Sequence, residues 1–326
     1  MEILVTGAAG YIGSIVTELL IDQGYDVIAL DNLSHGHRDA VHPKAEFKHA
    51  DLLDGDWLKA FFQSRKLYAV VHLAAEALID ESLRDPGRFF TANITGGINL
   101  LEAMAQSGVK NIVFSSTAAV YGQPEKTPIK ETAALCPVNS YGESKLAFER
   151  ILKWYQVAYE INHISLRYFN ACGATDMFGE FHMPETHLIP IIFEAALGER
   201  DALHLFGADY DTPDGTCIRD YIHVVDIART HILALSKIEE IKANAFNMGN
   251  GAGYSNLEVV ETVQRVVGKE ISVLKAERRP GDPERLVASS EKIRQELGWI
   301  PLYPDLGEMV ESAWEWRLAH PRGYSQ

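Results

Sequence analysis

A tyrosine and a lysine lie four residues apart in the segment NSYGESKLAFER, which runs from residue 139 to residue 150. Because four residues make about one helical turn, the side chains of Tyr141 and Lys145 would share one face of a helix. A free phenol has a pKa of about 10, and a neighbouring ammonium group favours its ionised form. The pair could therefore serve as a base that removes a proton from a substrate hydroxyl.

The start of this helix is predicted at Ser140. Ser140 and Glu143 have the spacing of a capping box, in which the two side chains satisfy the first free backbone N–H groups. A helix that begins there would bring its positive end close to Tyr141 and favour the phenolate as well. The alternative is an ordinary surface helix with a tyrosine–lysine contact.

Hydroxyl residues end an apolar run further upstream. In NIVFSST the last three residues are Ser115, Ser116 and Thr117, and Tyr141 follows 24 residues after Thr117. Parallel α/β sheets bind ligands at the carboxyl ends of their strands. We therefore expect Thr117 and Tyr141 to meet at one site, although the three hydroxyls could also do no more than cap the next turn.

The elements that would position these residues alternate between strand and helix. The runs EILVTG, YDVIALD, AEFKHAD, AVVHLAA and NIVFSS predict strands, and residues 12–23 and 93–107 between them have a helical period. HISLRYFN and AFNMGNG (245–251) predict two more strands. Continuous apolar strands separated by helices are typical of a parallel sheet covered on both faces. The sequence predicts an α/β fold with a Rossmann-like doubly wound sheet.

The second half of the chain has a different pattern. Glycine and proline become frequent beyond about residue 170, which predicts a smaller α+β lobe rich in loops. We expect residues 1–168 to form the sheet domain and residues 169–326 the second lobe. A segment at about 220–250 should contribute back to the main sheet.

Three glycines follow the first predicted strand. In TGAAGYIGS, Gly7, Gly10 and Gly13 would let the backbone approach a pyrophosphate, which the next helix receives on its free N–H groups. The second strand ends at Asp31, 18 residues after Gly13. A carboxylate there accepts hydrogen bonds from a ribose 2′-OH and repels a 2′-phosphate. The glycines alone would fit an ordinary turn, but the full series predicts a site for NAD rather than NADP.

The composition excludes several other classes of protein. The 326 residues are 47% hydrophobic and 23% charged, with a net charge of -15. This charge argues against a nucleic-acid or anionic-membrane binder, because phosphate affinity comes from Lys and Arg. Three widely spaced cysteines indicate reduced thiols. The chain opens on a predicted strand without room for a signal peptide, and no apolar run reaches the roughly 18 residues of a membrane span. We expect a cytoplasmic protein.

No metal site is predicted from the histidines. Those at positions 35, 37, 182, 187 and 223 share no metal-ligand spacing. They are interpreted as surface or packing residues.

Several motifs together resemble a known superfamily. T-G-x-x-G-x-x-G, the hydroxyl residue after the fifth strand and Y-x-x-x-K resemble the extended short-chain dehydrogenases/reductases. The similarity runs along nearly the whole chain and is greatest to the UDP-glucose 4-epimerase (UDP-galactose 4-epimerase) family. The more specific motifs are LRYFN, DGTCIRDYIHV and RRPGDP, which belong to that family's sugar-nucleotide lobe.

The resemblance implies an isomerase that interconverts UDP-galactose and UDP-glucose. Tightly bound NAD would oxidise the sugar at C4. The 4-keto sugar would then rotate in the site, and the hydride would return to its other face. Tyr141 would be the acid/base, Thr117 would hold the C4 hydroxyl, and Lys145 would bind the nicotinamide ribose and keep the phenol acidic.

The resemblance also implies two sets of binding residues. Those for NAD are Gly7, Gly10, Tyr11, Ile12, Gly13, Asp31, Asn32, Asp51, Leu52, Leu73, Ala74, Ala75, Asn93, Lys145, Tyr168 and Phe169. Those for the UDP-sugar are Thr117, Tyr141, Asn170, His187, Leu188, His204, Leu205, Phe206, Arg219, Arg279, Asp282 and Leu286.

The sugar-nucleotide contacts differ in kind. Asn170 and Arg219 would contact the diphosphate, although Arg219 could instead form an internal salt bridge with Asp220 or Asp226. Arg279 and Asp282 would clamp the phosphate and the uridine ribose, and the segment 204–206 would lie along the uracil. Leu286 corresponds to a position where a bulky tyrosine excludes N-acetylated sugars, so its intermediate size predicts activity on UDP-glucose and UDP-galactose with some on UDP-N-acetylglucosamine.

Other functions remain open at this point. A 4,6-dehydratase needs an acidic pair directly after the hydroxyl residue, where this chain has Ala118 and Ala119. An epimerase or decarboxylase of a uronic-acid substrate is excluded less firmly. A non-catalytic NAD sensor would be expected to lack the tyrosine or the lysine. The resemblance implies a homodimer, for which the helices at about 93–107 and 141–157 offer apolar positions.

Overall fold

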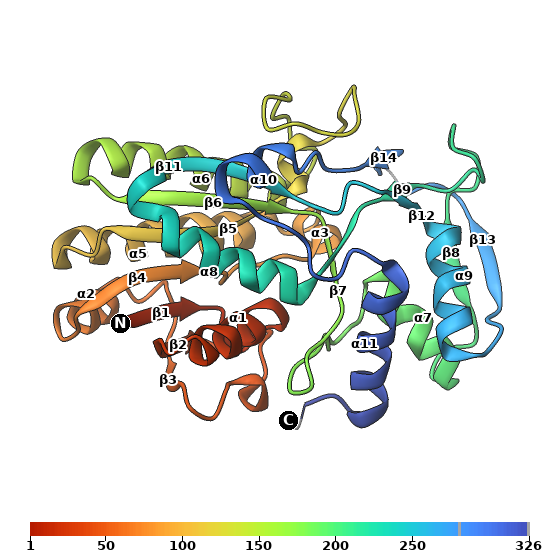
Figure 1. The fold of residues 1–326 in the computed structure, drawn as a ribbon, viewed down its shortest axis with the longest axis horizontal. Helices are drawn as coiled ribbons and strands as arrows, with labels where there is room; N and C mark the ends of the chain where they lie inside the picture. Colours follow the sequence, from red (N-terminus) through yellow and green to blue (C-terminus); the bar gives the residue numbers. More distant parts are fainter. Residues whose placement is uncertain (280–281, 325–326) are drawn as a thin grey trace.

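A seven-stranded parallel sheet forms the larger half of the molecule. The computed structural model describes residues 1–279 and 282–324. The strands lie in the order β3-β2-β1-β4-β5-β6-β11 (Figure 1). Their bounds are β1 (Glu2–Thr6), β2 (Asp26–Asp31), β3 (Glu46–His49), β4 (Leu67–His72), β5 (Asn111–Thr117), β6 (Asn162–Tyr168) and β11 (Ala243–Met248). The reversal of strand order beside β1 is the point at which doubly wound sheets bind ligands, so the predicted fold class is confirmed.

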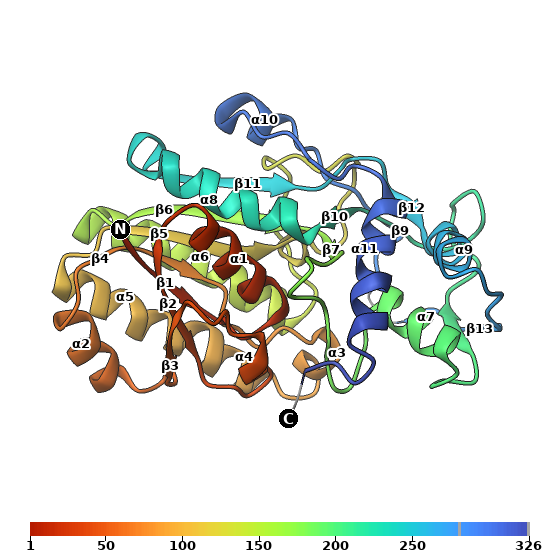
Figure 2. The ribbon, with the colours of Figure 1, turned by 60° about the horizontal axis from the view of Figure 1, so that its bottom comes forward.

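Helices cover both faces of this sheet (Figure 2). The helices of the chain are α1 (Tyr11–Asp22), α2 (Gly55–Gln63), α3 (Ile79–Ser82), α4 (Pro86–Phe90), α5 (Gly96–Ser107), α6 (Ser140–Tyr159), α7 (Leu188–Leu197), α8 (Val224–Ile241), α9 (Asn256–Val267), α10 (Glu291–Leu297) and α11 (Leu306–Ala319). Alternate residues of β1 show the two faces: Ile3 and Val5 pack in the core under α1 and α8, and Leu4 packs in the core under α2, α5 and α6. Because these strands are buried on both faces, they appear in the sequence as continuous apolar runs.

Short strands and α7, α9 and α11 build the smaller lobe. The short strands are β7 (Asn170–Cys172) with β10 (Tyr221–His223), β8 (Leu203–Phe206) with β13 (Val273–Ala276), and β9 (Ile218–Arg219) between β12 (Tyr254–Ser255) and β14 (Arg285–Leu286). After β10 the chain returns to the large sheet, where α8 packs against α1 and β11 pairs with β6. This return crosses from one lobe to the other at the edge of the sheet where the predicted site lies.

The first turn of α6 differs from the predicted capping box. The N-cap is Asn139, whose side chain accepts a hydrogen bond from the Gly142 N–H at 2.8 Å. Ser140 lies inside the helix and donates to the Ser82 carbonyl. The prediction of a box between Ser140 and Glu143 is therefore wrong by one residue, because asparagine with extended backbone is itself a favoured cap.

Helix α5 is preceded by a π-helical turn. The turn covers Thr91–Thr95, so the regular helix begins three residues after the predicted start at Asn93. Turns of this kind are frequent at functional sites, and Asn93 is buried within it.

Five histidines, His42 among them, are buried in the protein, and burial lowers the pKa of each. Burial lowers the pKa of His72 to about 3 and that of His163, His223 and His231 to about 4. His163 on β6 is the least satisfied of them, since neither ring nitrogen has a hydrogen-bond partner among the described residues. A buried polar group without a partner costs free energy, and a proton there would cost more.

Replacing His163 by valine should weaken the loss of stability in acid. In the unfolded chain a histidine titrates at about 6.5, and in the fold the pKa of His163 is about 4. The unfolded state thus binds more protons below pH 6.5, and stability falls as the pH drops towards 4. Between pH 7.5 and pH 4.5, His163→Val should therefore lose about 2 to 3 kcal/mol less unfolding free energy than the native protein, as measured by urea unfolding. The control is His49→Gln, at an exposed histidine. If unfolding free energy depended on pH equally in both variants, the acid sensitivity would not come from His163.

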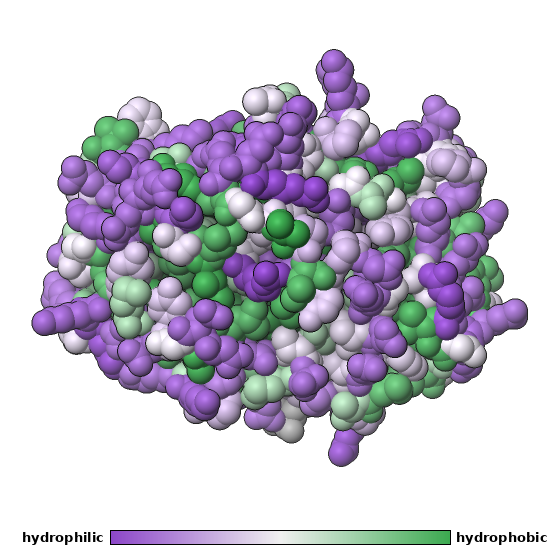
Figure 3. Space-filling view, in the orientation of Figure 1, coloured by the Kyte–Doolittle hydropathy of each residue, from purple (hydrophilic) through white to green (hydrophobic). Residues whose placement is uncertain are grey.

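The surface of the molecule is largely hydrophilic on the face drawn in Figure 3, with smaller apolar areas between the hydrophilic residues. Among residues 1–279 and 282–324, no helix combines the length and apolar character needed to cross a membrane.

The thiols of Cys136, Cys172 and Cys217 are free, as predicted.

Candidate active site

A groove of about 430 Å³ runs over the carboxyl edge of the sheet. Many of the residues predicted to bind NAD line it: Gly7, Gly10, Tyr11, Asp31, Asn32, Asp51, Leu52, Leu73, Ala74 and Ala75. The others, Ile12, Gly13, Asn93, Lys145, Tyr168 and Phe169, are not among the described residues that line this groove. The residues that line the groove include the predicted glycine turn and Asp31, as a dinucleotide site requires.

The glycine turn is packed too tightly for a side chain at two of its three glycines. Gly7 has a φ of +73°, and a Cβ on it would lie 2.6 Å from the Ala74 nitrogen. A Cβ on Gly13 would lie 1.9 Å from the Gly7 carbonyl oxygen. Around Gly10 there is more room, since a Cβ there meets only the Gly7 oxygen, at 3.4 Å. The turn therefore brings the backbone next to the groove at the start of α1, which fits a pyrophosphate.

Asp31 lies at the end of β2 inside the groove. Its two carboxylate oxygens accept hydrogen bonds from the Ala9 N–H at 3.0 Å and the Leu33 N–H at 2.8 Å. Burial raises the pKa of this carboxyl group, and the two N–H groups lower it in part. Each oxygen keeps a second lone pair for a ligand hydroxyl. The residues present thus fit the ribose of NAD.

Asn93 supports the groove from behind. Its side chain accepts from the Glu76 N–H at 2.8 Å and donates to the Ser144 hydroxyl at 2.9 Å. Asn93 thereby connects the segment after β4 to helix α6. This supporting role explains why Asn93, although predicted to contact NAD, does not line the groove itself.

The sequence analysis missed a charged cluster on the rim. The Glu76 carboxylate lies 3.0 Å from His35 Nε2 and 3.3 Å from the Arg88 guanidinium. His35 was predicted to be a surface or packing residue, but it lines the groove and hydrogen bonds to Glu76 raise its pKa. Only the place of Glu76, directly after the strand-end segment 73–75, could have indicated this cluster.

Tyr141, Lys145 and Thr117 come together where β5 ends against α6. The Lys145 ammonium nitrogen lies 6.0 Å from the centre of the Tyr141 ring and donates to the Ser115 carbonyl at 2.9 Å. The Thr117 hydroxyl accepts from the Ala119 N–H at 3.2 Å. The structure therefore brings the three predicted catalytic residues into one site.

In the polypeptide by itself, burial opposes the predicted acidity of the phenol. Burial raises the pKa of Tyr141, and a hydrogen bond with Thr117 lowers it only in part. Burial also lowers the pKa of Lys145 to about 7. Burial therefore disfavours the charged form of the lysine, whose positive charge would favour the phenolate.

Several residues predicted for the sugar nucleotide also meet. Arg219 pairs with Asp282, and not with Asp220 or Asp226. The Arg279 guanidinium lies over the Phe206 ring, 4.2 Å from its centre. An arginine on an aromatic ring is typical of sites for flat or anionic ligands.

Leu286 lies between the two halves of the site. It pairs with Arg219 in the register of β14 on β9. It also packs against the cluster of apolar residues that includes Ala118 and Phe169, next to Thr117. This position is the one predicted to contact the sugar.

Other predicted contacts are less direct. The Asn170 amide donates to the Asp220 carbonyl at 2.8 Å. On β8 the side chain of Leu205 is buried while that of His204 is exposed. Leu188 opens helix α7 and packs against the core of the smaller lobe. His187 precedes it and lines the cofactor groove.

Two histidines predicted to be isolated are not. His182 and His187 lie with Glu180 and Glu185 in the loop before α7, and one ligand atom from each of the four lies within 4.8 Å of the others. A folded loop brings these two histidines together, although their spacing in the sequence does not indicate a metal site.

A dinucleotide groove with a tyrosine–lysine pair at its end defines a class of proteins that move hydride and proton on nucleotide-linked substrates. The chain belongs to the NAD dependent epimerase/dehydratase family, whose model matches residues 3–249. This confirms the superfamily predicted from the motifs.

Relatives and solved structures cover the whole chain. A UDP-glucose 4-epimerase of Lacticaseibacillus casei is 50% identical, over 99% of this chain and 99% of its own. A Brucella ovis UDP-glucose 4-epimerase solved with NAD is 43% identical, with a TM-score of 0.93 over 97% of this chain and 98% of that one. A Bifidobacterium longum UDP-glucose 4-epimerase solved with NAD+ and UDP is 34% identical, with a TM-score of 0.94 over 99% and 100%.

Proposed function

We propose that this chain is a UDP-glucose 4-epimerase that interconverts UDP-galactose and UDP-glucose with tightly held NAD. The observation that carries the proposal is the meeting of Tyr141, Lys145 and Thr117 at the end of the dinucleotide groove. Full-length relatives that bear this name support it. The domain division follows, with residues 1–168 holding NAD and residues 169–326 holding the sugar nucleotide.

The chain's own residues supply binding and proton transfer. The chemistry that NAD supplies when bound is the removal of a hydride from the sugar C4 and its return to the other face of the ketone. Thr117 orients the C4 hydroxyl, and the Tyr141 oxygen takes its proton and later gives it back. Because burial raises the pKa of Tyr141, the phenol needs a positive charge beside it to act as a base.

The smaller lobe holds the rest of the substrate. Arg219 lies opposite Leu286 in the sheet and can turn its free N–H groups to a diphosphate, while Asp282 holds the guanidinium. Arginine suits phosphate oxygens because two N–H groups can bind at once. Arg279 over Phe206 offers a second cation beside a flat ring. This explains an anionic ligand in a chain of net charge -15.

Purified protein with UDP-galactose as the only added compound tests the function. We expect UDP-glucose to form without added NAD, followed by the anomeric proton signals in NMR. Loss of the C6 oxygen would indicate a dehydratase, and turnover of UDP-glucuronic acid alone would indicate a uronic-acid enzyme. Either result would overturn the proposal, as would an absence of product.

Leu286 should allow N-acetylated substrates. Its half-buried side chain leaves more room than a tyrosine would beside Phe169 and Ala118. We expect measurable turnover of UDP-N-acetylglucosamine, and we expect Leu286→Tyr to lower it by about 10- to 100-fold while UDP-galactose turnover stays similar. Leu274→Tyr, on an exposed position of β13, is the control. A native protein without N-acetyl turnover would reject the broader specificity.

A homodimer through α5 and α6 is part of the proposal. Trp154 and Val157 on α6 are 72% and 73% exposed, which is unusual for large apolar side chains on one helix face. Sedimentation should give twice the 36.2 kDa mass of the chain, and Trp154→Glu should give monomers. Ile300→Glu, at another exposed apolar residue, should not. Three free thiols favour a reducing compartment such as the cytoplasm.

A further inference from the structure

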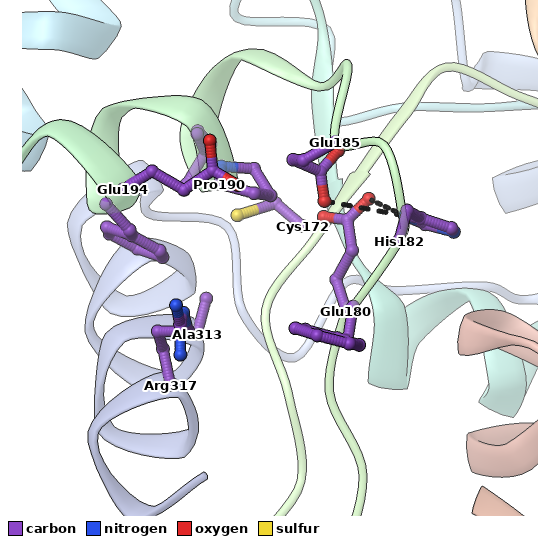
Figure 4. Close-up of a pocket in the computed structure, with 11 residues that line it drawn as sticks. Cys172, Glu180, His182, Glu185, Pro190, Glu194, Ala313 and Arg317 are labelled. Atoms are coloured by element: carbon purple, nitrogen blue, oxygen red, sulfur yellow. Dashed lines mark ion pairs between the residues drawn. The ribbon is translucent and has the colours of Figure 1, made fainter. Parts of the chain in front are cut away.

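Four side chains converge in the loop that joins β7 to α7. They are Glu180, His182, Glu185 and His187. Figure 4 shows the carboxylates of Glu180 and Glu185 directed at His182 from two turns of this loop. The His187 ring packs edge-on against His182, with ring centres 5.2 Å apart. None of these side chains belongs to the hydride and proton chemistry proposed above.

The distances between the four groups differ: those from His187 are ordinary ion-pair distances, and those from His182 are longer. From His187 Nδ1 the Glu180 and Glu185 oxygens lie at 2.8 and 3.2 Å, and from His182 Nδ1 they lie at 3.4 and 3.6 Å. A tetrahedral ion with bonds of about 2.1 Å separates its ligand atoms by about 3.4 Å. The four distances therefore scatter around the edge length of a metal tetrahedron.

One nitrogen atom of the cluster lacks a hydrogen bond within the described part of the chain. His182 Nδ1 is buried and makes no hydrogen bond with any of the described residues. Buried ring nitrogens of this kind are rare unless a ligand satisfies them. The opposing carboxylate is already oriented, because one Glu185 oxygen accepts from the Thr186 and His187 N–H groups at 2.8 Å each. The other Glu185 oxygen is the one that faces His182.

We propose that Glu180, His182, Glu185 and His187 bind one divalent transition-metal ion, with Zn²⁺ as the best fit. Two carboxylates balance the charge of the ion, and two neutral imidazoles complete four ligands. Imidazole nitrogens disfavour Mg²⁺ and Ca²⁺, which prefer oxygen, and suit Zn²⁺, Co²⁺ and Ni²⁺. The alternative is that the same residues bind no metal and form two imidazolium–carboxylate pairs. The experiment below distinguishes these two possibilities.

The ion would fix one wall of the cofactor groove. The loop lines that groove with Phe181, Met183 and Pro184, and with the two histidines themselves. On its other side the cluster faces a small cavity lined by Cys172 and by Arg317 of α11 (Figure 4). A metal there would join the loop to the interior of the smaller lobe and hold the groove open to its ligands. These four are positioning residues, so metal binding can be measured without turnover.

Cobalt titration of the full-length protein is the test. The protein is first treated with a chelator, and Co²⁺ is then added while the visible absorption is followed. We expect the intense bands of tetrahedral Co²⁺ to saturate at one ion per chain, Zn²⁺ to displace it, and the melting temperature to rise with either ion. A spectrum that stays that of hexaaqua Co²⁺, with no change in melting temperature, would overturn the proposal.

Variants separate this cluster from general surface binding. His182→Asn and Glu185→Gln should each weaken Co²⁺ binding by more than about 100-fold. Glu194→Gln is the matched control, because Glu194 lines the same small cavity but pairs with Arg200, and it should bind as the native protein does. Equal affinity in the control and in His182→Asn would also overturn the proposal. If Glu185→Gln does not fold, the Co²⁺ spectrum of the native protein and the Co²⁺ affinity of His182→Asn still test the proposal.

Discussion

Replacement of Tyr141 by phenylalanine should reduce the turnover of UDP-galactose by about 10²- to 10⁴-fold, the range expected for the loss of an acid/base group. The ring can keep its packing against α6 and β5, so the melting temperature should change little. The hydroxyl is the group that would move the proton, and it is hydrogen-bonded to Thr117. Turnover is measured from NMR signals of the two UDP-sugars, with NAD content measured in the same preparations.

A second tyrosine on the same helix gives the control. Tyr159 lies in the last turn of α6 and is 43% exposed, so Tyr159→Phe should turn over as the native protein does. If Tyr141→Phe retained normal turnover, the assignment of the base would be wrong. If it lost NAD or unfolded, the effect would belong to structure and not to proton transfer.

Replacement of Glu149 by alanine should cost about 3 to 5 kcal/mol of unfolding free energy. Glu149 on α6 accepts from Arg167 Nε at 2.9 Å and from the Ser116 hydroxyl at 2.5 Å, and both charged side chains are 4% exposed. Arg167 donates in turn to the Tyr121 hydroxyl at 2.8 Å. Without Glu149, the guanidinium is a buried charge with no counterion. Urea unfolding at neutral pH measures the loss.

A double variant tests the reason for that cost. Glu149→Leu with Arg167→Met removes both charges, and it should recover most of the stability that Glu149→Ala loses. The exposed pair Lys130–Glu291 is the control, and Lys130→Ala should cost less than about 1 kcal/mol. A Glu149→Ala variant as stable as Lys130→Ala would show that the buried network does not hold α6 against β5 and β6.

Short-range patterns in the sequence predicted the parts of the protein that depend on backbone direction. Apolar runs predicted the strands of the large sheet, because strands buried on both faces have no polar side. The segment around Gly7 and Gly13 predicted the groove, since a close approach of backbone to ligand requires glycine at these places. Tyr141 and Lys145 share a helix face by spacing alone.

Contacts between distant residues could not be read from the sequence. Arg219 and Asp282 are 63 residues apart, so two closer acids looked equally suitable as partners. The network of Glu149 and Arg167 depends on how α6 lies on β6, and the cluster around His182 depends on the path of one loop. Burial of Tyr141, which raises the pKa of its phenol in the polypeptide, is a property of the fold and could not be read from the spacing of Tyr141 and Lys145.

Deuterium at C4 of UDP-galactose gives the most direct test of the central claim. If Tyr141 moves only the hydroxyl proton and the C4 hydrogen travels as a hydride that stays in the site, UDP-glucose formed in ordinary water should keep the deuterium at C4. If the deuterated UDP-galactose also carries ¹³C in its sugar and is mixed with unlabelled UDP-galactose, the deuterium should stay with the ¹³C-labelled molecules. Loss of the deuterium to water would contradict the account, because it would mean that C4 is inverted by deprotonation.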